Sequence, residues 1–300
     1  MDHPQNPVTV EVSNARSAAA ACPGTLYVVA TPIGNLGDIT LRALDILRSV
    51  DVIAAEDTRM TSRLLNRHGI SGRLIAVHEH NERRAAETVT GMLAGGKAVA
   101  LVSDAGTPGI SDPGAQVVAA ARAAGHAVVP LPGANAAVAA LSASGFDAAR
   151  FLFCGFLPSR PAERRRALAE LAAERALLVF YEAPHRIADC IADMCAILGG
   201  GREILIAREL TKLHETLRRC RLDAAGEWLQ GDEHRRRGEF VLVVEGAPGA
   251  AREEPDKAEG VLRVLLAELP LKQAVALAVQ LTGGNRNELY SLALRLKQES

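Results

Sequence analysis

The sequence contains few aromatic residues, no long apolar run and almost no net charge. Phe, Trp and Tyr make up 3% of the 300 residues, which disfavours the aromatic stacking platforms of single-strand nucleic-acid binding proteins. Its 34 basic and 35 acidic residues leave a formal net charge of -1, so bulk charge does not hold the protein to nucleic acid, although local basic patches remain possible. It also lacks the roughly 18 consecutive apolar residues of a membrane-spanning helix, so we predict no contact with a membrane.

The cysteines and histidines offer no metal site. The five cysteines form no C-x-x-C pair, the spacing typical of zinc clamps and redox pairs. We therefore expect free thiols in a reducing compartment and a cytoplasmic protein. His78 and His80 alternate along an extended segment and so point to opposite faces, unlike the H-E-x-x-H pattern of a helix. The sequence predicts no bound metal.

Three common catalytic or nucleotide-binding signatures are missing. No G-x-G-x-x-G follows the first predicted strand, and no G-x-x-x-x-G-K-[ST] occurs, which disfavours dinucleotide and P-loop nucleotide binding. No G-x-S-x-G elbow is present either, which disfavours an α/β hydrolase. What remains is a chain with 48% hydrophobic and 23% charged residues, values typical of a globular enzyme.

Residues 24–131 alternate short apolar runs with amphipathic helical patterns. Continuous apolar runs are typical of strands buried on both faces of a parallel sheet. We therefore predict a doubly wound α/β domain here. The predicted strands are 25–30, 51–55, 74–77, 98–103 and 127–130, and helical patterns include 58–67 and 82–94.

A second α/β block and a helical region follow. The second block has predicted strands at 151–154, 176–181, 203–207 and 240–245, with helical patterns at 162–173, 184–198 and 222–230. Three further helices, 257–268, 271–282 and 286–298, are predicted to form a small C-terminal bundle. The predicted organisation is a disordered tail over 1–22, an N-terminal α/β domain over 23–133, a second α/β domain over 134–247, a linker over 248–256 and a C-terminal helical region over 257–300.

Unusual loops follow several predicted strands. Residues 103–114, S-D-A-G-T-P-G-I-S-D-P-G, hold three glycines, two prolines and two aspartates. Glycine lets the backbone approach a ligand closely, and proline stiffens a loop. Ligands of open parallel sheets bind beyond the carboxyl ends of the strands. A cleft of this composition without a phosphate signature suits a ligand that lacks a polyphosphate, such as S-adenosylmethionine.

Six motifs in order resemble the tetrapyrrole methylase superfamily. Together they resemble one branch closely, the ribosomal RNA small subunit methyltransferase I family. The likeness extends from about residue 24 to 246 and continues into L-P-L-K-Q-A-V-A at 269–276. The six motifs are T-P-I-G-N-L-G-D-I-T at 31–40, A-A-E-D-T-R at 54–59, residues 103–114 as above, P-L-P-G at 130–133, F-Y-E-A-P-H-R at 180–186 and A-R-E-L-T-K at 207–212.

The resemblance implies an activity, a fold and a set of cofactor residues. The family methylates the ribose 2′-hydroxyl of a cytidine in the decoding region of 16S rRNA with S-adenosylmethionine. Its fold has two α/β domains with the cofactor in the cleft between them, and its members are usually homodimers. Carried over by motif, the cofactor residues are Pro32, Gly34, Asp104, Gly106, Pro108, Ile110, Asn135, Ala136, Glu182 and Ala207. The hinge departs from the family pattern at Ala134 and Asn135, where relatives often have a second proline and Cys, Ser or Thr. Since Asn135 can still form hydrogen bonds, we expect altered contacts with the cofactor rather than a loss of cofactor binding.

Catalysis requires a group that accepts or routes one proton from the hydroxyl. Glu182, Glu209 and Asp104 are candidates, because each lies in a loop at a strand end. Lys212, three residues after Glu209, is a candidate for stabilising the developing alkoxide. A solvated ion pair between Glu209 and Lys212 is the plainer alternative. Glu182, Glu209 and Lys212 are thus the predicted catalytic residues, with the base unassigned.

Clusters of arginine in the second block suggest a surface that faces phosphates. Each run alone is most often a solvated face, but several runs confined to one domain of a nearly neutral chain favour RNA contact. Two alternatives remain: a methylase of a tetrapyrrole or other small molecule, and a non-catalytic ribosome-assembly factor. The predicted RNA-binding residues are Arg164, Arg165, Arg166, His185, Arg186, Arg235 and Arg236, with 16S rRNA or the small ribosomal subunit as partner.

Overall fold

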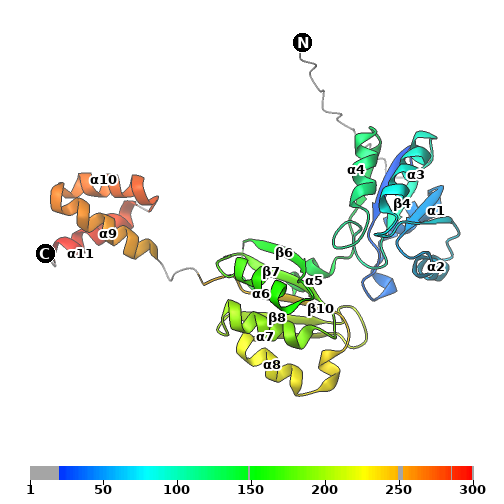
Figure 1. The fold of residues 1–300 in the computed structure, drawn as a ribbon. Helices are drawn as coiled ribbons and strands as arrows, with labels where there is room; N and C mark the ends of the chain where they lie inside the picture. Colours follow the sequence, from blue (N-terminus) through cyan, green and yellow to red (C-terminus); the bar gives the residue numbers. More distant parts are fainter. Residues whose placement is uncertain (1–19, 148, 249–252, 285, 299–300) are drawn as a thin grey trace, which may run out of the picture. The chain divides into compact units, whose positions relative to one another are not determined.

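The computed structural model describes residues 20–147, 149–248, 253–284 and 286–298 (Figure 1). The chain divides into two compact units, one up to Gly246 and one from Ala247 onward. The first unit contains two five-stranded sheets, and the second contains three helices. Most of the predicted tail, 1–19, lies outside the described residues. Its last residues are anchored, since Ala21 N donates to Ser49 Oγ and Cys22 N donates to Tyr27 Oη.

The first sheet is parallel throughout, with the strand order β3-β2-β4-β1-β5. Alternate residues of β1 enter different cores: Tyr27 and Val29 pack with α1 and α2, whereas Leu26 packs with α3 and α4. Both faces of the sheet are therefore covered, as a doubly wound domain requires. The elements are β1 (Thr25–Val29), η1 (Leu36–Asp38), α1 (Leu41–Ser49), β2 (Val52–Ala55), α2 (Thr58–Arg67), β3 (Arg73–Ala76), α3 (Glu82–Ala94), β4 (Val99–Val102), α4 (Ala115–Ala123) and β5 (Ala127–Leu131).

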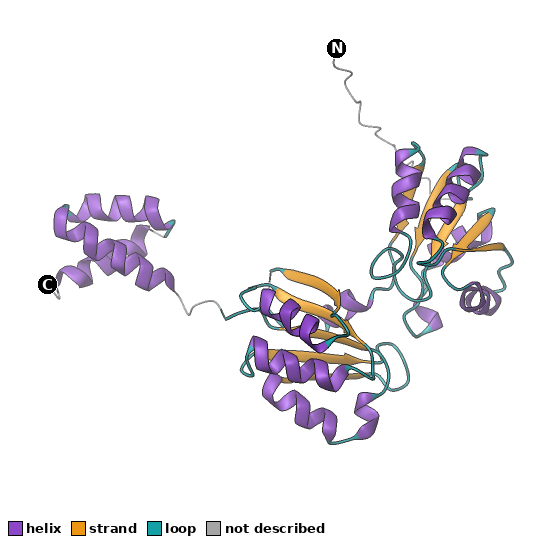
Figure 2. Cartoon of the chain, viewed as in Figure 1, coloured by secondary structure: helices purple, strands orange, loops and turns teal. Residues whose placement is uncertain are grey.

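The second sheet is mixed, with the order β6-β7-β10-β8-β9. Strands β6, β7 and β8 run in one direction, and β10 lies antiparallel between β7 and β8. The carboxyl ends of β7 and β8 therefore meet where β10 begins. Helices α6, α7 and α8 pack on one face, and α5 packs on the other (Figures 1 and 2). The elements are α5 (Ala136–Ser142), β6 (Phe151–Phe156), α6 (Pro161–Glu170), β7 (Leu177–Glu182), α7 (Ile187–Leu198), β8 (Glu203–Arg208), β9 (Thr216–Arg221), α8 (Leu222–Gln230), η2 (Glu233–Arg236) and β10 (Phe240–Val244).

The predicted fold class is confirmed: a parallel doubly wound sheet, a second α/β part and C-terminal helices. Strand β9 (Thr216–Arg221) was not predicted, because its sequence is rich in arginine rather than apolar. A strand at the edge of a sheet tolerates charged side chains because one side has no neighbouring strand. Helix α5 was also missed, because its run of alanines shows no polar face.

The C-terminal unit is a bundle of α9 (Glu253–Glu268), α10 (Leu271–Thr282) and α11 (Arg286–Gln298). Its core includes Leu262, Val275, Leu289 and Leu296. Helix α9 begins before the expected start at 257 and so occupies part of the predicted linker 248–256; Pro255 lies in its first turn, where proline is tolerated. No helix in the described part of the chain is long and apolar enough to cross a membrane.

Glu82 anchors the glycine- and proline-rich loop 103–114. Its buried carboxylate accepts hydrogen bonds from Gly114 N at 2.7 Å, Gln116 N at 2.9 Å and Gln116 Nε2 at 3.2 Å. These backbone amides belong to the start of α4, where a negative charge also complements the helix dipole. Glu82 on α3 therefore fixes the point at which the loop returns to the sheet.

We expect Glu82→Ala to lower the free energy of unfolding by about 2–3 kcal/mol, because buried donors lose a charged acceptor. Urea denaturation measures the change. Glu87→Ala is the matched control, since Glu87 is an exposed residue of the same helix. Equal effects of the two substitutions would show that the anchor is unimportant.

Candidate functional site

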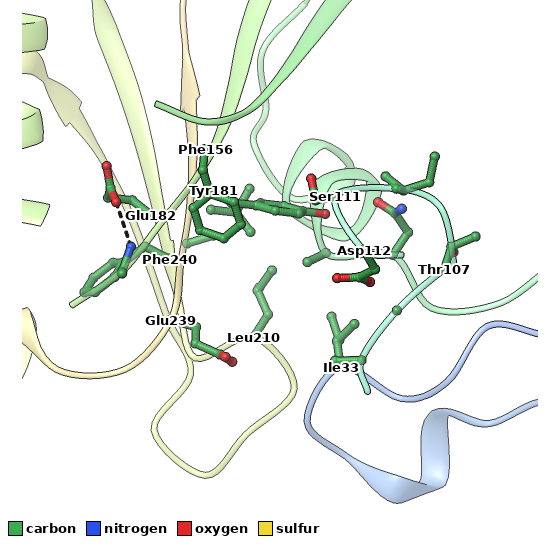
Figure 3. Close-up of a pocket in the computed structure, with 18 of the residues that line it drawn as sticks. Ile33, Thr107, Ser111, Asp112, Phe156, Tyr181, Glu182, Leu210, Glu239 and Phe240 are labelled. Carbon is green, nitrogen blue, oxygen red and sulfur yellow. Dashed lines mark hydrogen bonds between the residues drawn. The ribbon is translucent and has the colours of Figure 1, made fainter. Parts of the chain in front are cut away.

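A cavity of about 310 Å³ lies between the two sheets of the first unit. The loops after β1, β4 and β5 line it on one side, and the ends of β6, β7 and β8 with the start of β10 line it on the other. Figure 3 shows Thr107, Ser111 and Asp112 at one end of the cavity, and Glu182 and Phe240 at the other. Its volume lies within the range of small-molecule sites.

The cavity lining is predominantly apolar and carries a negative charge balance. Among the described residues that line it, Asp112, Glu182 and Glu239 are acidic and Lys212 is basic. Glu182 is paired with Arg186 and Glu239 with Lys212. Asp112 is therefore the lining carboxylate whose charge is not balanced by an ion pair within the described residues, and its negative charge favours a cationic group of a ligand.

Asp112 has the most strongly shifted acidic group of the lining. Burial raises the pKa of its carboxyl to about 6, and the negative charges of Glu56 and Asp104 add to this, whereas a hydrogen bond with Ser103 opposes it. Asp112 belongs to the loop 103–114 but was not among the predicted site residues. Its position deep in the loop distinguishes it from Asp104, which is exposed.

Asp104 holds two loops together and does not line the cavity. Its Oδ1 accepts from Asp57 N at 3.0 Å, and its own N donates to Glu56 Oε2 at 3.2 Å. These bonds join the loops after β2 and β4. Burial raises the pKa of both Glu56 and Asp104, although each also accepts a backbone hydrogen bond that lowers it. No group of three potential metal ligands occurs in the described ranges.

Glu182 lies buried at the opposite end of the cavity. Its Oε1 accepts from Ala183 N at 2.9 Å and lies 3.2 Å from Arg186 Nε. Within the described residues its Oε2 is buried without a hydrogen-bond partner. The Arg186 guanidinium also donates to the carbonyls of Leu157 and Pro158. Arg186 is therefore the counter-ion of Glu182, and its contact with RNA stays a prediction.

Lys212 is held between two carboxylates. Its Nζ lies 2.8 Å from Glu209 Oε1 and 2.6 Å from Glu239 Oε2. Burial lowers the pKa of Lys212, but the hydrogen bonds to Glu209 and Glu239 raise it overall. Burial raises the pKa of Glu209, yet the hydrogen bonds from Lys212 and from Glu239 N lower it overall. Lys212 is thus protonated and Glu209 ionised at neutral pH.

Backbone strain is concentrated around this site. Ser111, Glu209 and Thr211 have φ of 65°, 52° and 65°, the left-handed region that non-glycine residues rarely adopt. Gly238, with φ of +93°, faces Glu209 so closely that a Cβ there would lie 2.4 Å from Glu209 Cγ. Strained residues persist where the surroundings force them, often at functional sites.

Gly34 brings the loop after β1 against the loop after β8. A Cβ at Gly34 would lie 2.5 Å from Lys212 Cγ and 2.8 Å from Thr211 Oγ1. Asn35 N donates to Thr211 Oγ1 at 3.0 Å. Gly34 therefore acts through close packing on Lys212 and does not line the cavity.

The structure brings together part of the predicted cofactor set. Pro32, Gly34, Asp104 and Pro108 are absent from the cavity lining; Pro32 and Pro108 are buried. Glu239 and Phe240 line it but were not predicted, because they lie where an antiparallel strand begins and not in a loop that follows a strand. The predicted residues that do line the cavity are Gly106, Ile110, Asn135, Ala136, Glu182 and Ala207.

The predicted RNA-binding residues are more scattered. Arg164 is corrected: its side chain is 4% exposed and pairs with Asp193 at 2.6 Å, so it stabilises the contact between α6 and α7. Arg165 shares the same carboxylate. Arg235 donates to Trp228 O and lies over the Trp228 ring. Arg166, His185 and Arg236 are exposed.

Solved structures and a family model agree on the class of protein. The chain resembles the uroporphyrin-III-C-methyltransferase of Thermus thermophilus (TM-score 0.53, 21% identity, 73% of this chain and 94% of that chain). It also resembles the methyltransferase CobJ (TM-score 0.56, 22% identity, 75% and 95%). The family model of the Tetrapyrrole (Corrin/Porphyrin) Methylases matches residues 25–226. The fold is therefore that of the tetrapyrrole methylase class.

Curated relatives narrow the class to one family. "Ribosomal RNA small subunit methyltransferase I" of Escherichia coli O157:H7 is 51% identical over 271 residues, 90% of this chain and 95% of the relative. The protein of the same name from Pseudomonas aeruginosa is 50% identical over 279 residues, 92% and 99%. A model described as the RsmI C-terminal HTH domain matches residues 252–297. The chain belongs to the ribosomal RNA small subunit methyltransferase I family, as its motifs predicted.

We expect Asp112→Asn to stabilise the protein at pH 8 and to have little effect at pH 4. The folded state raises the pKa of Asp112 to about 6, so the destabilisation by the ionised carboxyl is complete above that pH. It declines between pH 6 and pH 4 and disappears only below the pKa of the unfolded chain, about 4. Thermal denaturation at pH 4 and pH 8 measures the difference. Asp147→Asn, at an exposed carboxylate, is the control; a gain of equal size at pH 4 and pH 8 would contradict the role of ionisation.

Proposed function

We propose that this protein transfers a methyl group from S-adenosylmethionine to the ribose 2′-hydroxyl of a cytidine in the decoding region of 16S rRNA. The observation that carries the proposal is the 51% identity, over 90% of the chain, to a protein named as a methyltransferase of small-subunit rRNA. The motif resemblance adds the cytidine and the 2′-hydroxyl. The small ribosomal subunit would be the partner and the cytoplasm the compartment.

The cavity fits S-adenosylmethionine. This cofactor supplies an electrophilic methyl group on a positively charged sulfur, and it carries no phosphate. The carboxylates of Asp112 and Glu239 complement its positive charges. Ile33, Leu210 and Phe240 offer an apolar lining for its purine ring. The charge balance thus distinguishes this cofactor from nucleotide di- and triphosphates.

Lys212 and its neighbours have two roles in the proposed reaction: to stabilise the negative charge that develops on the ribose oxygen and to hold the Lys212 amine in position. Lys212 lines the cavity, and its protonated amine is suited to stabilise the oxygen that develops negative charge as the hydroxyl proton leaves. Glu209 does not line the cavity and pairs with Lys212, so we assign it a positioning role rather than that of general base. Holding the nucleophile in line with the methyl group supplies a further part of the rate enhancement.

A second copy of the chain is part of the proposal. Strand β6 forms one edge of the second sheet and exposes Phe151 and Leu152, at 53% and 39%. Exposed apolar edges are typical of surfaces that pair with another chain. These observations support a homodimer.

The activity can be tested with unmethylated small ribosomal subunits and S-adenosylmethionine labelled on the methyl group. We expect label in an alkali-resistant dinucleotide that begins with cytidine, because alkali cannot cleave next to a methylated 2′-oxygen. Label in a mononucleotide would instead indicate base methylation. An absence of incorporation, with the cofactor still bound, would favour a small-molecule methylase.

We expect Lys212→Met to lower the rate of methyl transfer by about 10²–10³-fold, as is typical for the loss of a group that stabilises an oxyanion. Glu209→Gln should have a smaller effect, since Lys212 keeps Glu239 as its partner. Single-turnover transfer with saturating cofactor measures both. Glu227→Gln, on the exposed side of α8, is the control. A wild-type rate in Lys212→Met would remove Lys212 from the catalytic residues.

A further inference from the structure

An open groove lies beside the cavity and shares Lys212 with it. The loop after β1, the end of α2 and the loop after β8 line the groove, through residues 34–37, Arg67, His68 and residues 211–213. The hydrogen bond from Asn35 N to Thr211 Oγ1 and the close packing of Gly34 on Lys212 join its two walls. The groove is thus built by segments far apart in the chain.

The groove has one basic side chain whose charge is not paired. Arg67 and Lys212 both line it, and none of the described residues that line it is acidic. The charge of Lys212 is already balanced by Glu209 and Glu239. Arg67 is exposed, and no ion pair joins it to another residue of the described chain. Its charge is therefore available to a ligand, whereas the arginines of the α6 cluster pair with neighbouring carboxylates.

Two apolar side chains flank the same groove. Leu213 is 92% exposed and Leu36 is 44% exposed. Both lie in loops whose geometry is fixed, Leu36 behind the Asn35 cap of η1 and Leu213 after the strained Thr211. An anionic ligand with a flat apolar face matches this combination, and a nucleotide of an RNA strand has both features.

We propose that the groove binds an RNA nucleotide adjacent to the target cytidine. Its phosphate would lie between Arg67 and Lys212, and its base would pack on Leu213 and Leu36. Since Lys212 lines both hollows, a nucleotide in the groove places the neighbouring ribose at the cavity where the methyl donor binds. The proposal rests on the proposed function and extends it to a named RNA subsite.

The test measures binding of a short fluorescein-labelled single-stranded RNA of the decoding-region sequence to the full chain. We expect Arg67→Gln to weaken binding about tenfold and to reduce the slope of log affinity against log salt by about 1, as the loss of one phosphate contact does. Leu213→Ser should weaken binding about threefold without changing that slope, because a base contact releases no counterion. Cofactor affinity, measured by calorimetry, should stay unchanged in both variants.

Arg63→Gln is the matched control, since Arg63 is an exposed cation one turn earlier on α2 and does not line the groove. Equal weakening by Arg63→Gln and Arg67→Gln, or wild-type binding by Arg67→Gln and Leu213→Ser, would overturn the subsite. If the wild-type protein methylates rRNA and both groove variants bind RNA normally, the subsite fails and the function stands. If the variants lose RNA as expected but the wild-type protein transfers no methyl group, the subsite stands and the function fails.

Discussion

The contact of Lys212 with Glu209 and Glu239 is the interaction on which the site depends. It fixes one amine at the wall that the cavity and the groove share. Glu209 reaches Lys212 from a left-handed backbone conformation, and Gly238 must lack a side chain for Glu209 to fit. Gly34 must lack one too, because the Lys212 stem packs directly on it. The left-handed Glu209 and the two glycines therefore all help to hold the amine of Lys212 in position.

Local charge, rather than net charge, determines what such a site can bind. The chain is almost neutral, yet the carboxylate of Asp112 lines the cavity and the guanidinium of Arg67 lines the neighbouring groove. Runs of arginine were a poor guide to this pattern, since Arg164 and Arg165 share Asp193. An arginine that pairs with a carboxylate contributes little to the outside field. Arg67, isolated in the sequence, keeps its charge available because no carboxylate lies against it within the described residues.

The sequence predicted those features that follow from local pattern. Apolar runs located the strands of the first sheet, and the loop 103–114 was recognised by its glycines and prolines. Residues brought in by antiparallel pairing were not predictable in this way: Glu239 lies at the amino end of β10, and only the sheet order shows that this end reaches the cavity. Asp112 lines the cavity and Asp104 does not. The sequence does not distinguish them, because both are aspartates of the same loop and their burial depends on the fold.

The two sheets around the site offset the unfavourable charge repulsion and backbone strain of its loops. Asp112 is half-buried near the negative charges of Glu56 and Asp104, an arrangement that raises its pKa and destabilises its ionised form. Ser111, Glu209 and Thr211 add backbone strain. The apolar cores on both faces of each sheet stabilise the strands that hold these loops, so the loops cannot relax. A cation in the cavity offsets the repulsion among the carboxylates, and binding is therefore coupled to the stability of the loops that form the site.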